Sequence, residues 1–210
     1  DVKATLPYSL INNKNYDIAP GLSQEETNIQ ISEKYKWLEY YKLSAKGKWY
    51  TSFTDKLVLM TNAELGFLGY YNADVGLSPF ERYFVGGDGI AVFQLDGREV
   101  VGLRGYENNQ LSPLEGGSIY NKFQLELRYS ITDAPSASIY TLGFLEAGNS
   151  YDNFQTFNPF ELKRSAGVGV RIFMPAFGLL GIDFAHGFDP LPGFTEKSGW
   201  QTHFIIGRQF

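Results

Sequence analysis

The feature that most constrains this chain is a period-two alternation of apolar and polar residues. Successive side chains of a β-strand point to opposite faces of its sheet, so such a segment predicts a strand with one apolar and one polar face. The pattern is cleanest over residues 122–131, where Phe123, Leu125, Leu127, Tyr129 and Ile131 alternate with Lys122, Gln124, Glu126, Arg128 and Ser130.

Alternation of this kind predicts about eight strands along the chain. They cover residues 2–6, 37–53, 57–69, 122–131, 139–148, 165–174, 180–185 and 201–210. Most of the connections between these strands fall into two classes. The short ones are residues 54–56, 132–136 and 175–178, and the long ones are 7–33, 70–119, 149–164 and 187–199. Short turns at one end and long loops at the other are typical of an outer-membrane β-barrel, so the predicted fold class is all-β, an antiparallel transmembrane β-barrel.

A soluble β-sandwich is the alternative, because its strands alternate in the same way. It is less favoured here, because the polar faces are rich in glycine and carry few charges. A membrane-spanning helix is not expected. The most apolar segment, residues 168–185, is interrupted by Arg171, Pro175 and Asp183. The first residue is Asp1 and no signal peptide is visible, so we expect the chain to be part of a longer protein.

Composition and motifs argue against several other functions. The chain has no cysteine, which excludes disulfides, Cys-ligated zinc and thiol catalysis. Its formal net charge is -5 and no basic block stands out, so no nucleic-acid partner is expected. The two histidines, His186 and His203, have no partner at metal-ligand spacing. No phosphate-binding loop or Gly-x-Ser-x-Gly elbow is present. We therefore expect no enzyme, no cofactor and no metal.

The segment 70–119 is too long for a simple turn and contains two distinctive runs. The first is Tyr83-Phe84-Val85-Gly86-Gly87-Asp88-Gly89, in which Gly86, Gly87 and Gly89 indicate a backbone with special dihedral angles. The second is Val101-Gly102-Leu103-Arg104-Gly105-Tyr106, which places one arginine beside a glycine in an apolar stretch.

These two runs resemble the BamA family of outer-membrane β-barrel assembly factors, in the bacterial surface antigen superfamily. That family has a Phe/Tyr-x-x-Gly-Gly segment followed by a Val/Leu-Arg-Gly-Phe/Tyr motif in a long extracellular loop. The spacing between Gly89 and Gly102 is longer here. The resemblance implies that residues 1–210 are the C-terminal portion of a barrel of about sixteen strands. The POTRA domains of that family are not present in this chain.

The resemblance also implies roles for individual residues. Loop 70–119 would fold into the lumen, where the motif formed by Leu103, Arg104, Gly105 and Tyr106 would pair its arginine with Glu126 and Glu146. The alternation independently places both carboxylates on polar, inward faces. At the C-terminus, the resemblance assigns a β-signal and a weak seam to Phe204, Ile206, Gly207 and Phe210.

The function implied is assembly and insertion of β-barrel proteins into the bacterial outer membrane, by β-augmentation of clients at the seam. The implied partners are nascent outer-membrane proteins, outer-membrane lipids and accessory assembly subunits. The alternative is a protein-translocating barrel of the same superfamily, either TamA-like or a two-partner secretion translocator. A membrane-embedded enzyme, a passive pore and a barrel attached to a secreted catalytic domain are further alternatives with no supporting motif.

Overall fold

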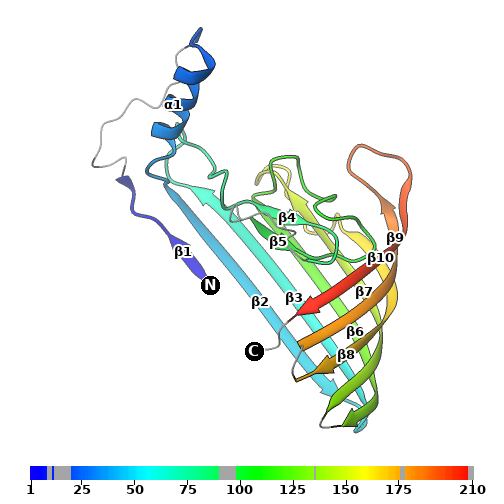
Figure 1. Ribbon diagram of the computed structural model, residues 1–210. Helices are drawn as coiled ribbons and strands as arrows, with labels where there is room; N and C mark the ends of the chain where they lie inside the picture. The colour runs from blue at the N-terminus through cyan, green and yellow to red at the C-terminus, as the bar shows by residue number, and fades with distance from the viewer. Residues whose placement is uncertain (9–10, 12–19, 90–97, 135, 176–177, 208–210) are drawn as a thin grey trace.

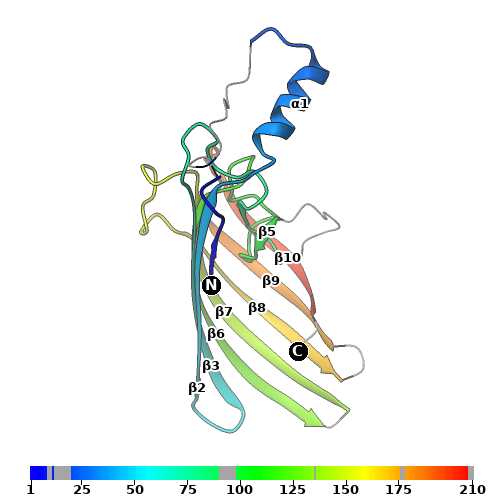
Figure 2. The same cartoon turned by 90° about the vertical axis from the view of Figure 1, so that its left-hand side faces the viewer.

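The main feature of the computed structural model is one antiparallel sheet of eight strands in the order β1-β2-β3-β6-β7-β8-β9-β10. The model describes residues 1–8, 11, 20–89, 98–134, 136–175 and 178–207. The strands of the sheet are β1 (Val2–Ala4), β2 (Tyr40–Ser52), β3 (Leu57–Tyr70), β6 (Ile119–Ala134), β7 (Ala137–Tyr151), β8 (Lys163–Met174), β9 (Gly178–Pro190) and β10 (Lys197–Gly207). Figures 1 and 2 show that the sheet is strongly curved and open, with β1 and β10 at its two ends.

Burial of side chains follows the predicted alternation. On β6, Phe123 and Leu125 are 46% and 45% exposed, whereas Glu126, on the opposite face, is 3% exposed. The same holds on β8, where Val168 is exposed and Arg171 is buried. The apolar side chains cover the convex face of the sheet. A continuous apolar surface of this kind is unfavourable in water and favourable against lipid, as on the outside of a membrane barrel.

Three turns, between β2 and β3, β6 and β7, and β8 and β9, lie at one end of the sheet, and the long loops lie at the other (Figure 2). One long loop is shorter than predicted. Residues 187–199 were expected to form a loop, but β9 continues to Pro190 and β10 begins at Lys197. Gly187 and Gly199 pair with each other across the two strands. Gly187 allows close approach of the backbone of Gly105, so this glycine marks a packing contact and not a turn.

The helix α1 (Gln24–Lys34) begins within segment 7–33, where no element was predicted, and ends one residue beyond it. A capping box begins it: the Glu26 amide donates to the Ser23 hydroxyl at 3.4 Å, and the Ser23 amide donates to the Glu26 carboxylate at 3.0 Å. The Ser-x-x-Glu pattern was the available sequence signal for this helix. In the described part of the chain, no helix combines the length and apolar composition needed to cross a bilayer.

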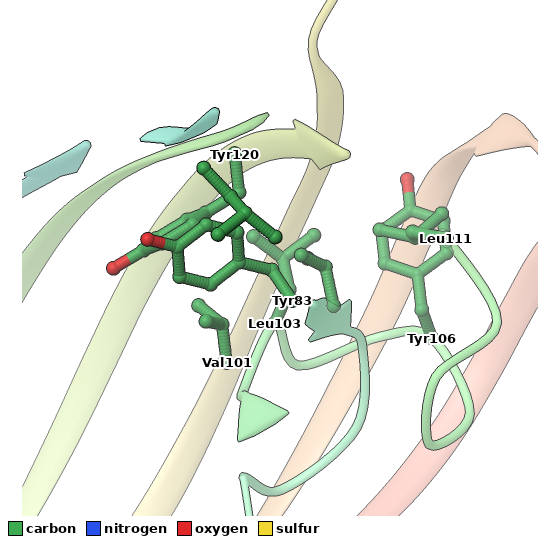
Figure 3. Packing of buried hydrophobic residues seen from close by; sticks show 8 residues of the cluster. Tyr83, Val101, Leu103, Tyr106, Leu111 and Tyr120 are labelled. Carbon is green, nitrogen blue, oxygen red and sulfur yellow. The ribbon is translucent and has the colours of Figure 1, made fainter. Parts of the chain in front are cut away.

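The long loop between β3 and β6 packs against the concave face of the sheet. It contains a parallel pair of short strands, β4 (Tyr83–Val85) and β5 (Glu99–Val101), which was not predicted. Figure 3 shows the apolar cluster beneath it, in which Tyr83 of β4 lies beside Tyr120 of β6 with ring centroids 4.6 Å apart. The other buried members are Leu68, Val85, Val101, Leu103, Tyr106 and Leu111. The loop and the sheet therefore share one small core.

The lipid-facing assignment of the convex face can be tested with one charge. Leu127→Arg places a guanidinium in the middle of β6 on that face. We expect it to lower the free energy of unfolding by about 2–4 kcal/mol in lipid vesicles, because a cation near the bilayer midplane is poorly solvated. Urea unfolding followed by tryptophan fluorescence measures this. The control Ser130→Arg adds the same charge to the concave face of β6. An equal loss of stability in both variants would contradict the assignment.

Candidate functional site

The two runs singled out in the long loop lie against each other. The amide of Gly86 donates to the carbonyl oxygen of Val101 at 3.0 Å, and that of Gly87 donates to the carbonyl oxygen of Leu103 at 3.1 Å. Gly86, Gly87 and Gly89 all have positive φ, at 129°, 77° and 77°. The backbone of the glycine-rich run (residues 86–89) thus holds the start of the loop motif (residues 103–106) in place through hydrogen bonds.

Leu103 and Tyr106 anchor the loop motif in the apolar cluster, and both are fully buried. The Tyr106 hydroxyl donates to the carbonyl oxygen of Arg164 on β8 at 2.8 Å. Burial raises the pKa of Tyr106 to about 12, so this hydroxyl remains a donor at neutral pH. Between the anchors, Gly105 has a φ of 88°, and a Cβ there would lie 2.8 Å from Cβ of Ser165. Only glycine fits this position without displacing the wall.

Arg104 extends from the loop motif into the concave face of the sheet and is 6% exposed. Its Nε and Nη2 donate to Oε1 of Glu146 at 3.0 and 2.7 Å, and its backbone amide donates to Oε2 of the same carboxylate at 2.8 Å. Nη2 also donates to Glu126 at 2.9 Å. The structure thus brings together the arginine and both carboxylates named from the sequence.

A third carboxylate completes the site, and the sequence analysis did not assign it a role. Nη1 of Arg104 donates to Oδ2 of Asp183 on β9 at 2.8 Å. Asp183 is fully buried and also accepts two hydrogen bonds from Arg171 on β8. In the sequence, Asp183 alternates with the apolar residues Ile182 and Phe184. This alternation was the available signal for an inward side chain, but it does not say which polar residue meets the loop.

The guanidinium of Arg104 is also stacked on an aromatic ring. Its Cζ lies 3.4 Å from the ring centroid of Phe144 on β7. The planar guanidinium thus combines charge-assisted hydrogen bonds at its edge with a cation–π contact on its face. Burial alone would lower the pKa of Arg104, but the carboxylates of Glu146, Glu126 and Asp183 raise it above its ordinary value. The arginine is therefore a permanent cation and a structural clamp, with no capacity to exchange protons.

Further cations surround the same carboxylates. Nε of Arg128 lies 2.7 Å from Glu126, and Nζ of Lys122 lies 3.9 Å from Glu146. Arg171 is the corresponding neighbour of Asp183. Each of the three carboxylates therefore has a second cationic neighbour besides Arg104. In the described residues, no group of three or more His, Asp and Glu side chains is arranged to hold a metal ion. The ion pairs around Arg104 therefore act as a clamp that joins the loop to the inner face of the sheet.

The loop motif also contacts the last strand. The amide of Gly105 donates to Nε2 of His203 on β10 at 2.9 Å, and His203 is buried. Since this nitrogen accepts a hydrogen bond, neutral His203 carries its proton on Nδ1. From the sequence, His203 was considered only as a metal ligand, so this role was not predicted. Four strands, β6, β7, β9 and β10, thus supply hydrogen-bonding side chains to two consecutive residues of the loop motif.

A second attachment joins the loop to the other side of the sheet. Nζ of Lys42 on β2 lies 3.0 Å from a carboxylate oxygen of Glu81 and 2.9 Å from one of Glu99, both in the loop. The Tyr40 hydroxyl donates to Glu81 at 3.0 Å. Burial raises the pKa of Glu81, but the hydrogen bonds from Lys42 and Tyr40 outweigh it and hold this pKa below its ordinary value. The loop is therefore attached to β2 as well as to β6, β7, β9 and β10.

The residues assigned to the seam lie apart from this clamp. Phe204 and Ile206 are exposed on the convex face of β10. Gly207 is the last residue of β10 and pairs with Leu179 of β9, and nothing occupies the space where its Cβ would be. Phe210 lies outside the described residues. Within those residues β10 pairs with β9 alone, so its other edge is the end of the sheet.

The fold and the site define a class of protein: part of the wall of an outer-membrane β-barrel, with a long loop clamped to its inner face through a buried arginine. The chain belongs to the Omp85 superfamily, because the model of the Omp85 superfamily domain matches residues 12–210. This match confirms the superfamily expected from the sequence.

A solved structure has a similar fold. It is "The crystal structure of BamA from Haemophilus ducreyi lacking POTRA domains 1-3", with a TM-score of 0.59 and 17% sequence identity. The match covers 80% of this chain and 35% of that one. It confirms the predicted fold class, and it shows that this chain spans about a third of the length of that solved chain. No curated protein sequence matches this chain.

Removal of the buried arginine tests the clamp. Arg104→Ala leaves Glu146, Glu126 and Asp183 without their shared cation. We expect a loss of about 3–5 kcal/mol in the free energy of unfolding, because three buried carboxylates lose the cation that they share. We also expect faster cleavage of loop 70–119 by protease. The control Arg164→Ala removes an exposed arginine that pairs with Asp189 on the same sheet. Unchanged protease sensitivity in Arg104→Ala would show that the clamp does not hold the loop.

The contact with the last strand is tested separately. His203→Leu removes the acceptor for the buried amide of Gly105. We expect a cost of about 1–3 kcal/mol and faster hydrogen exchange at that amide, because a buried donor loses its partner. Amide exchange followed by mass spectrometry of the loop peptide measures this. Gln201→Leu, on the same face of β10, is the control and leaves the exchange rate unchanged. Equal exchange rates in both variants would refute the role of His203.

Proposed function

We propose that the protein assembles and inserts β-barrel proteins in the bacterial outer membrane. Membership of the Omp85 superfamily supports a role in insertion or translocation of proteins in general. The observation that carries the more specific proposal is the arrangement around β10: this strand ends the sheet and is tied to the buried loop motif through His203. The proposal needs no chemical step, cofactor or metal.

The proposed mechanism is β-augmentation at β10. A strand at the end of a sheet presents unpaired backbone N–H and C=O groups, which can template an incoming strand. In the complete barrel, of about sixteen strands in this proposal, β10 would meet the first strand at a seam. Gly207 would weaken that seam, because a glycine packs no side chain against its neighbours and marks a bend. A nascent client would then pair with β10 in place of the first strand.

The clamp at Arg104 would serve this mechanism by keeping the rest of the wall rigid. The carboxylates on β6, β7 and β9 converge on one guanidinium, so these strands are cross-braced on the inner face. By contrast, β10 is joined to the loop motif through one hydrogen bond to a backbone amide. Separation of β10 from the first strand would therefore leave the hydrogen bonds of Arg104 to β6, β7 and β9 intact.

Residues 1–210 contain no cysteine, so a thiol introduced among them is unique within this part of the protein and makes a direct test practical. A cysteine at Ile205 on β10 is expected to form a disulfide with a cysteine in the terminal strand of a client trapped during assembly. The control cysteine at Val168 lies on β8, which is paired on both sides, and is expected not to react. Gel electrophoresis without reductant measures the adduct.

Depletion of the protein distinguishes insertion of barrel proteins from translocation of secreted proteins, the two activities considered for this protein. Loss of other barrel proteins from the outer membrane supports the insertion function. Normal barrels together with loss of one secreted protein would instead indicate a translocator. Equal cross-linking from β8 and β10 would contradict augmentation at the last strand, whichever activity depletion shows. Accessory assembly subunits are also proposed as partners. They would be identified among the proteins that co-purify with the cross-linked complex.

A further inference from the structure

The convex face is not uniformly packed, because two apolar hollows lie one after the other along β7. The hollow nearer the long loops has a cavity volume of about 570 Å³ and is lined by Phe123, Leu125, Leu145, Ala147 and Phe188, among others. The second, nearer the short turns, has a volume of about 480 Å³. It is lined by Leu127, Tyr129, Thr141, Gly143, Val168 and Phe184, among others. Together we call them the β7 trough.

Each hollow lies over small residues on the outer face of β7. Thr141 and Gly143 line the lower hollow and Ala147 lines the upper one, whereas the neighbouring strands place larger side chains on either side. Leu145, which is 57% exposed, stands between the two hollows. Phe123, Leu125 and Leu127 of β6 stand along one wall, and Val168 and Phe184 stand along the other. A Cβ added at Gly143 would have no contact closer than 4.0 Å, so the glycine is not required by packing within the protein. The floor leaves room for something outside the chain.

The upper end of the trough is positively charged. Arg164 and Lys197 both line the upper hollow, at the end nearer the long loops. Arg164 is held in place by Asp189, with Nη2 2.8 Å from its carboxylate. For Lys197, the described residues provide no carboxylate at ion-pair distance, so its charge is available to an outside anion. The trough thus combines an apolar floor with a cation at one end, which is the complement of an anionic lipid.

The dimensions agree with one leaflet. At about 3.3 Å per residue, the distance along β7 from Thr141 to Ala147 is about 20 Å. For a strand tilted by about 45°, this corresponds to about 14 Å along the membrane normal. One leaflet of a hydrocarbon core about 30 Å thick is about 15 Å deep. A single acyl chain can therefore reach both hollows by passing beside Leu145, with its headgroup at the level of Lys197.

We propose that the β7 trough is a binding site for a phospholipid of net negative charge in the leaflet on the long-loop side, with its phosphate at Lys197 and an acyl chain over Gly143 and Ala147. The proposal requires only that the convex face contacts lipid, and it is independent of the insertion activity proposed above. Arg164 supports the headgroup from the other side of the hollow, while Asp189 limits the net charge there.

The experiment measures lipid preference at the protein surface. The protein is refolded in phosphatidylcholine vesicles that contain a small fraction of spin-labelled phosphatidylglycerol or, separately, spin-labelled phosphatidylcholine. Electron paramagnetic resonance then gives the immobilised fraction of each probe. We expect the wild-type protein to hold the anionic probe more strongly. Lys197→Gln is expected to reduce this preference by about fivefold, the effect of one cation near a membrane surface.

The apolar part has its own variants. Gly143→Leu and Ala147→Leu fill the floor of the trough and are expected to reduce the immobilised fraction of the anionic probe. Ala63→Leu is the matched control: residue 63 is exposed on β3 and pairs with Phe123, at the level of Ala147 on the same face. Lys56→Gln, in the turn at the opposite end of the sheet, controls for charge. All four are surface changes, and gel mobility before and after heating verifies folding.

Three results would overturn the site. The first is equal immobilisation of both probes by the wild-type protein. The second is an equal effect of Lys197→Gln and Lys56→Gln, which would indicate a general surface charge effect. The third is an equal effect of Ala63→Leu and Ala147→Leu. None of these results bears on cross-linking at β10, so failure of the lipid site and failure of the proposed function remain distinguishable.

Discussion

The interaction on which the rest of this structure depends is the sharing of one buried guanidinium by carboxylates from three strands. Arg104 reaches Glu126, Glu146 and Asp183 at 2.7–3.0 Å and rests on the ring of Phe144. Each partner would be costly to bury alone, because an unpaired charge in a poorly solvated site loses several kcal/mol of hydration free energy. The loop and the wall are therefore stable in this form only together.

Room for this interaction comes from glycines on the inner face. A Cβ at Gly167 would lie 2.5 Å from the Phe144 ring, and one at Gly181 would lie 2.5 Å from Cδ of Arg171. Gly169 makes the same allowance for Asp183. Large ionic side chains and the loop backbone fit between strands because their neighbours have no side chain. The glycine that enriches the polar faces of the strands thus has a specific role: it makes the sheet thinner where the loop packs.

Much of the fold was predictable because alternation is a local signal. The period of two predicted the strands around Phe123 and Leu125 and placed Glu126 and Glu146 on the inner face, and the structure agrees. Asp183 and His203 were missed as loop partners, since their role depends on register and strand tilt over β8 to β10. The helix α1 had a local signal in Ser23 and Glu26 that was not used. The pair β4 and β5 had none, because short strands within a loop are defined by their partners.

The separation of the clamp partners along the chain has a consequence for the order of folding. Arg104 is bonded to residues 22, 42 and 79 positions away, and Gly105 to a residue 98 positions away. Contacts this distant form only after the intervening strands have paired, because closing long loops costs entropy that must be recovered elsewhere. Until β6 to β10 are in register, the carboxylates that compensate Arg104 for its lost hydration free energy are not in place. Docking of the loop therefore requires that these strands have already paired correctly. A strand paired out of register would leave the loop undocked and accessible to proteases.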